Sequence, residues 1–153
     1  MKIFTLLSTL GLVVATALAP GQSFAEPDTP KQEAMRVLDE FMLAFNARDE
    51  TAWLATLHFP HVRVASGETR LDATPEAMMS SFDFEQFAKR FDWHHSAWLS
   101  REVVQSGSDK VHVAVRFARY DAEGATTAEF DSLYIVARRE GRWGVVGRSS
   151  FAP

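Results

Sequence analysis

The sequence predicts an α+β fold in which three N-terminal helices pack on a strongly curved, mainly antiparallel sheet. The strongest indication is residues 98–151, which read as a four-stranded meander rich in Val, Phe, Trp and Tyr. Three short polar turns separate the strands, each with a glycine able to adopt a positive φ: residues 106–109, 121–124 and 140–141. The second indication is the helical spacing of apolar residues before the meander. A curved sheet that closes over helices makes a cone with a cavity.

The first residues are typical of an export signal. A positive start precedes an almost wholly apolar run, residues 3–19, and Ser23 and Ala25 supply small side chains at the −3 and −1 positions of a cleavage site. We therefore expect residues 1–25 to be a signal peptide, residues 26–29 a linker and residues 30–153 one domain, which is periplasmic or secreted. A membrane anchor is the alternative, but the run is short for a span of about 20 residues. We expect no membrane association after cleavage.

Composition excludes several classes of function. The formal net charge is −4, and no cluster of Lys and Arg is present, which argues against nucleic acid as a partner. The chain has no cysteine. Disulfides, thiolate zinc sites and cysteine-based catalysis are therefore ruled out, and packing alone must hold the fold.

The first helix has a clear beginning. Thr29 can cap it, Pro30 suits the first helical position, and Gln32 can complete a capping box. One apolar stripe then recurs at helical spacing: Ala34, Val37, Leu38, Phe41, Met42 and Phe45. We expect this helix to end near Asn46.

A second, shorter helix is expected to begin after Asp49 as its N-cap, to bury Trp53 and to end at Pro60. Residues 62–65 and 69–71 then read as a short hairpin around a Ser-Gly-Glu turn.

The third helix opens at Thr74 with the same pattern of cap followed by proline. It should reach about Phe91, with a break near Ser81 or Asp83. A connector that contains Trp93 leads into the meander.

Strand alternation assigns side chains of the meander to two faces, provided that no bulge shifts the register. In the strand after residue 110, one face carries Val111, Val113, Val115 and Phe117, and the other carries Arg116. In the next strand Asp131 and Tyr134 are expected on different faces of the sheet, and the same holds for Val145 and Arg148 in the last strand. Both faces hold apolar residues, yet helices can cover only one. We therefore expect a homodimer that covers the other face.

The order of helix, helix, short hairpin, helix and meander resembles the NTF2-like superfamily, and its SnoaL-like branch in particular. The resemblance covers residues 32–151 and rests on these local matches: residues 45–49, 60–63, 93–96, 133–136, 141–145 and 148–151. It implies an NTF2-like cone with a pocket, and it points to a group of exported proteins without an assigned activity. Because this superfamily hosts both enzymes and binding modules, the fold does not select a function.

The catalytic sets of the superfamily's enzymes are not intact in this sequence. Ketosteroid isomerases carry a carboxylate beside the proline after the second helix and a Tyr on the first helix. Here that proline is flanked by His58-Phe59 and His61, and the first helix offers only Phe41 and Phe45. The His, Tyr and Asp set of scytalone dehydratase has no obvious motif here. The Asp-Arg-Asp relay of limonene-epoxide hydrolase could be matched only in part, by Arg116 with Asp131.

Histidines are the first candidate site residues. His58 and His61 flank Pro60 at the expected mouth of the cone, and His94 with His95 lies in the connector. An imidazole can act as a base near neutral pH or bind a metal, but these spacings match no zinc motif, so we expect no metal. The alternative is that these are loop histidines bonded to backbone.

Arg116, Asp131 and Arg148 are expected on three successive strands, where they could line up laterally. They could orient a carboxylate ligand through a bidentate arginine, or form a structural ladder of ion pairs. If they faced the cavity, Asp131 would be the best acid–base candidate.

Aromatic residues complete the candidate set. Trp93 and Trp98 are candidates for the pocket wall, and the twelve Phe residues favour an apolar cavity for a flat ligand. The candidate ligand-binding residues are Trp93, His94, Trp98, Arg116, Tyr134 and Arg148; the candidate catalytic residues are His58, His61 and Asp131. Two hypotheses follow: a module that binds a small apolar molecule or only dimerises, and a cofactor-free lyase, isomerase or hydrolase that uses a His/Asp pair. Neither requires a cofactor, and we expect none.

Overall fold

The computed structural model describes residues 28–153, so the predicted signal peptide and most of the predicted linker lie outside the described residues. The elements follow one another in this order: α1 (Pro30–Ala47), α2 (Glu50–Ala55), β1 (Leu57–Ala65), β2 (Glu68–Asp72), α3 (Pro75–Met79), α4 (Phe84–Phe91), β3 (His95–Ser106), β4 (Lys110–Tyr120), β5 (Thr126–Arg139) and β6 (Arg142–Ser150). None of the helices within residues 28–153 is both long enough and apolar enough to cross a membrane.

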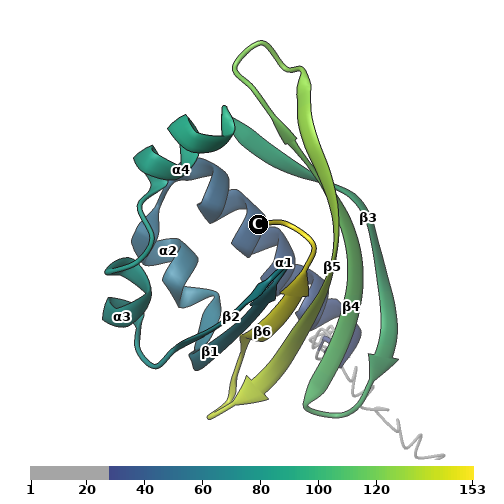
Figure 1. Ribbon diagram of the computed structural model, residues 1–153. Coiled ribbons are helices and arrows are strands. Elements are labelled where there is room, and N and C mark those ends of the chain that lie inside the picture. The colour runs from purple at the N-terminus through teal and green to yellow at the C-terminus, as the bar shows by residue number, and fades with distance from the viewer. Residues whose placement is uncertain (1–27) are drawn as a thin grey trace, which may run out of the picture.

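The strands form one mixed sheet in the order β2-β1-β6-β5-β4-β3. Within residues 28–153, β1 and β6 pair in parallel and the other strand pairs are antiparallel. Figure 1 shows the sheet bent around the helices, which gather on its concave side. The predicted α+β class, with helices packed on a curved and mainly antiparallel sheet, is confirmed.

The helix boundaries follow the capping signals in the sequence. Thr29 and Gln32 form the predicted capping box at the start of α1, and Asp49 caps α2. The predicted third helix is interrupted: Ser80 ends α3, and Asp83 caps α4. Asp83 accepts a hydrogen bond from the backbone N–H of Gln86, which satisfies one of the free donors of the first turn.

The prediction that the second helix extends to Pro60 was wrong. The helix ends at Ala55, and β1 already begins at Leu57, because the last strand of the meander pairs with this segment. The N–H of Val145 donates to the carbonyl of Thr56 at 2.9 Å, and Leu57 is the register partner of Val145. The β1–β6 register shifts between Leu57 and Val62, so Pro60, which has no N–H to donate, lies where the ladder is interrupted.

The core lies between α1 and the concave face of the sheet. Val37 and Leu38 of α1 are almost fully buried, as are Val113 of β4 and Val136 of β5. Burial of side chains of this size contributes about 1.5–3 kcal/mol each, before entropy costs. The predicted apolar stripe of the first helix therefore meets the sheet face that carries Val113 and Val136, whereas the sequence pattern left open which of the two faces the helices cover.

The predicted faces hold in β4 and β5 but not in β6. Arg116 is the register partner of Asp131 and shares its face of the sheet, and Val113 is the register partner of Tyr134 on the other face, as alternation requires. In the β5–β6 pair the register shifts between Ile135 and Val136. As a result Val145, beside buried Val136, and Arg148, beside buried Tyr134, both face inward. The prediction that Val145 and Arg148 oppose each other was wrong because an irregularity in the ladder exchanges the faces.

Candidate functional site

A cavity of about 490 Å³ lies between the concave face of the sheet and the helices. Arginine and serine side chains line part of it, and aromatic residues line much of the rest, including Phe41, Phe45, Trp53, Trp98, Phe117 and Tyr134. Their rings meet edge to face: Tyr134 lies 5.6 Å from Phe41 and 5.7 Å from Trp98 between ring centroids. Such contacts hold the rings in fixed orientations, which gives the cavity a rigid apolar wall.

Three strands place arginines side by side on this wall. Arg63 of β1 is the register partner of both Arg70 on β2 and Arg148 on β6, and all three line the cavity. Arg70 pairs with Asp72 at 2.9 Å. Arg148 donates to the hydroxyl oxygen of Tyr134 at 2.9 Å. Arg63 donates to the backbone oxygens of Ala152 and Pro153 at 3.2 and 2.7 Å.

Arg119 of β4 is a further arginine of the cavity, and it is 6% exposed. Its guanidinium lies over the rings of Phe87, Phe91 and Phe130, 4.7–4.9 Å from each centroid. No hydrogen bond from this side chain to another residue of the described chain is found.

Burial and mutual repulsion act on these guanidiniums. Burial, assisted by the nearby charge of Arg148, lowers the pKa of Arg63 to about 10. The pKa of Arg119 also falls to about 10, first through burial and then through the charges of Arg148 and Arg63. Because both values stay well above neutral pH, both side chains remain cationic there.

His61 is the only histidine of the described chain that lines this cavity. Its Nδ1 lies 3.3 Å from the carbonyl oxygen of Val145, an acceptor, so Nδ1 carries the proton and Nε2 has a free lone pair. Burial, assisted by the charge of Arg148, lowers the pKa of His61 to about 4. The ring is therefore neutral at physiological pH.

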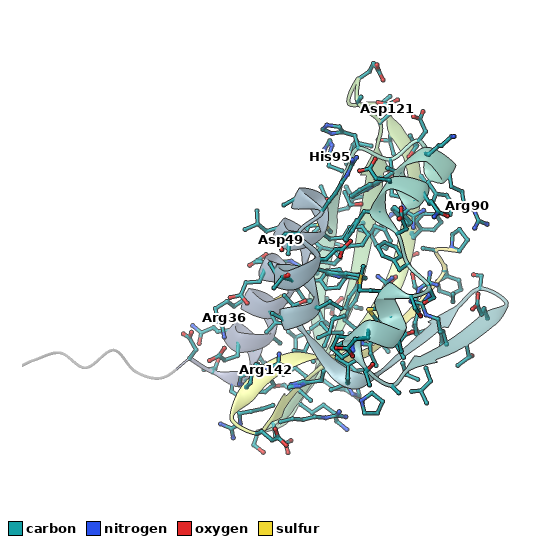
Figure 2. All side chains as sticks on the ribbon, turned by 90° about the vertical axis from the view of Figure 1, so that its left-hand side faces the viewer. Arg36, Asp49, Arg90, His95, Asp121 and Arg142 are labelled. Carbon is teal, nitrogen blue, oxygen red and sulfur yellow. The ribbon has the colours of Figure 1, made fainter. Side chains whose placement is uncertain are left out.

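The other predicted histidines lie away from the cavity. Nε2 of His58 is within 3.2 Å of the carbonyl oxygens of Ala137 and Arg142, and its Nδ1 accepts from the Arg142 guanidinium at 2.9 Å. His94 is exposed and contacts His95. Figure 2 shows Arg142 and His95 at opposite ends of the molecule, so the two histidine pairs do not converge.

Asp131 and Arg116 lie together on the outer face of the sheet, where they border a shallower depression. Arg116 makes its hydrogen bonds to Glu129, at 2.7 and 3.2 Å. Arg148 does not join them, since it projects from the inner face beside Tyr134. The lateral row of Arg116, Asp131 and Arg148 considered from the sequence therefore does not form, and Asp131 is not brought near His61.

Of the remaining candidates, Trp98, Tyr134 and Arg148 line the cavity, whereas Trp93 belongs to the core. The Trp93 indole N–H donates to the Ser96 hydroxyl at 2.9 Å. Sequence reasoning missed Arg63 and Arg119. A signal for Arg119 was present, because it continues the alternation of Val111, Val113, Val115 and Phe117 and so belongs to the inner face. No group of three or more His, Asp or Glu side chains that could hold a metal ion occurs within residues 28–153.

The helix-backed curved sheet and its enclosed cavity define the class of fold as NTF2-like, also called cystatin-like. The family described as NTF2-like protein (DUF6841) matches residues 32–151, and the chain belongs to this family. No curated protein sequence matches the chain.

Solved structures with the same fold are distant in sequence. A protein of unknown function with a cystatin-like fold from Nostoc punctiforme is 14% identical, with a TM-score of 0.66 over 79% of this chain and 89% of that one. An NTF2-like protein from Cytophaga hutchinsonii is 17% identical, with a TM-score of 0.62 over 82% and 100% of the two chains. A ketosteroid isomerase-like protein from Erwinia carotovora atroseptica is 20% identical, with a TM-score of 0.56 over 78% of this chain and 92% of that one. At these identities the likeness shows the fold alone.

Proposed function

We propose that this protein binds a small, largely apolar molecule in the cavity between α1 and the sheet. The observation that carries the proposal is the aromatic cavity itself. Its volume of about 490 Å³ lies within the usual range of ligand pockets, about 300–1,000 Å³. A rigid apolar wall with a few polar side chains is the usual construction of such a site.

Binding without catalysis fits the placement of the titratable groups better than the enzyme hypothesis does. His61 is in the cavity, but a pKa of about 4 makes it a weak base at neutral pH. Asp131, the acid that the enzyme hypothesis pairs with it, lies on the outer face of the sheet. The His/Asp pair therefore lacks the convergence that proton transfer requires.

Two measurements test the binding proposal. Native mass spectrometry of the protein purified from its own cell envelope should show a co-purifying small molecule. The neutral dye N-phenyl-1-naphthylamine should gain fluorescence with the wild type and lose that gain in Ala65→Trp, which fills the cavity from β1. Leu43→Trp, at an exposed position of α1, is the matched control and should bind like the wild type. A dye that binds Ala65→Trp and wild type equally would contradict the proposal.

We further propose that the outer face of the sheet pairs with a second copy of the chain. Ala114, Leu133 and Phe151 border the depression there, and Phe151 is 72% exposed. Exposed apolar side chains on a sheet face favour association. Sedimentation velocity should report a dimer that Leu133→Glu converts to a monomer; a wild-type monomer would refute this.

Export is the remaining proposal. The apolar run and the small residues Ser23 and Ala25 support cleavage after Ala25. The intact mass of the protein recovered from the periplasm or medium should correspond to a chain that begins at Glu26.

A further inference from the structure

Unlike Arg70, which is paired with Asp72, the cavity arginines Arg63, Arg119 and Arg148 have no acidic side-chain partner among the described residues. Six ion pairs occur among residues 28–153, and none of them includes Arg63, Arg119 or Arg148. Arg63 and Arg148 are direct register partners on neighbouring strands, an arrangement in which like charges destabilise a sheet. Arg63 and Arg148 have hydrogen-bond acceptors in the fold, the Ala152 and Pro153 oxygens and the Tyr134 hydroxyl, but none of these is an acidic side chain.

Arg119 shows the imbalance most clearly. The faces of the three rings around it attract the cation, but they do not supply the negative charge that normally accompanies a buried ion. The N–H groups of this guanidinium, which lines the cavity, also have no hydrogen-bond acceptor among the described residues. An acceptor that is itself charged would supply both.

The cavity is rich in donors and poor in acceptors. Besides the guanidiniums, the indole N–H of Trp98 is buried and has no partner in the described chain, and the same is true of Nε of Arg63. The one acidic side chain among the lining residues is Glu68, on β2. A ligand that complements this set must bring acceptor oxygens and negative charge, and its remainder must suit aromatic walls.

We infer that the cavity selects an organic carboxylate with a planar, apolar body, held through Arg119, Arg148 and Arg63. This inference rests on the proposed binding function and names the class of ligand. A guanidinium presents two parallel N–H groups to a carboxylate, and such charge-assisted pairs are about twice as strong as neutral hydrogen bonds. The ring body of the ligand packs against Phe41, Trp98 and Phe117.

The test compares two probes of the same shape, 2-naphthoate and 2-naphthamide, by isothermal titration calorimetry with the full mature protein at neutral pH. The wild type should bind the carboxylate at least about tenfold more tightly than the amide. Arg119→Met should abolish that preference. Arg116→Met removes one positive charge from the outer face and should keep the preference unchanged, which separates a specific contact from net charge.

The outcomes separate this inference from the proposed function. Equal affinity of the wild type for the two probes, or dye binding with no binding of 2-naphthoate, overturns the carboxylate inference and leaves the binding function intact. Failure of both probes and of the neutral dye overturns both. The comparison of probes on the wild type needs no variant, so a folding defect in Arg119→Met does not remove the test.

Discussion

The side-chain amide of Asn46 is bonded to the backbone of Ser96 by two hydrogen bonds. Its Nδ2 donates to the Ser96 carbonyl at 2.8 Å, and its Oδ1 accepts from the Ser96 N–H at 2.8 Å. The amide thus satisfies the Ser96 N–H and carbonyl as a neighbouring strand would, and it fixes the end of α1 to the beginning of β3. This contact supports one side of the cavity, because Ser96 and Phe45 both line it.

Asn46→Asp should destabilise the fold although the two side chains have the same shape. The carboxylate can still accept from the Ser96 N–H but presents a second acceptor to the Ser96 carbonyl. We expect a loss of about 1–3 kcal/mol in the free energy of unfolding, measured by urea denaturation. Arg36→Gln, which removes a surface pair with Glu33 and Glu40, is the control and should cost less than about 1 kcal/mol. Equal effects of the two changes would contradict the proposed contact.

Gly147→Ala should disturb the parallel pairing of β1 with β6. A Cβ at this position would lie 2.9 Å from both the Val62 carbonyl oxygen and its Cγ1, so β1 and β6 would have to move apart. Overpacking of this kind costs about 1–3 kcal/mol, which thermal unfolding would detect. Gly107→Ala is the control, because the nearest atom there is 3.7 Å away. A Gly147→Ala protein with unchanged melting temperature would show that the strands pair differently.

His61 should make stability depend on pH in mildly acidic solution. Its pKa falls from 6.5 to about 4 on folding, so the unfolded chain binds more protons between these values. The free energy of unfolding should therefore decrease as pH falls from about 6.5 to about 4, by up to about 3 kcal/mol. Below about pH 4 the contribution of His61 should no longer change with pH.

The matched variant for that effect is His61→Asn, whose amide can keep the hydrogen bond to Val145 but does not titrate. Urea denaturation of both proteins between pH 4 and 7 should give a shallower loss of stability for His61→Asn. Parallel curves would mean that the ring is not buried in its neutral form.

Arg119→Met should raise the free energy of unfolding of the ligand-free protein. The substitution removes a buried cation without a carboxylate partner and keeps a long side chain among the rings of Phe87, Phe91 and Phe130. Replacing buried charge by apolar side chains stabilises some proteins by about 1–4 kcal/mol. If Arg119 served only to hold these rings together, the same change would destabilise the protein. Chemical denaturation without ligand decides between the two roles.

Local chemistry in the sequence predicted much of the secondary structure. Thr29, Asp49 and Thr74 begin helices because their side-chain oxygens satisfy free backbone donors close by in the chain. The glycine-bearing turns of the meander likewise depend on neighbouring residues. Pro60 was misread because its structure depends on distant residues. Locally it resembles a helix terminator, but its segment pairs with β6, more than eighty residues later in the chain.

The sequence by itself determined the fold class, the apolar stripe of α1 and which side chains of β4 and β5 share a face, since periods of 3.6 and 2 residues fix these groupings. Only the tertiary structure decided the character of the cavity. A register shift near Val145 turned Arg148 inward, and the pairing of β1 with β6 placed Arg63 beside it. The same folding left Asp131 on the outer surface. These positions depend on which strands meet and in which register, and interactions between residues far apart in the chain set both.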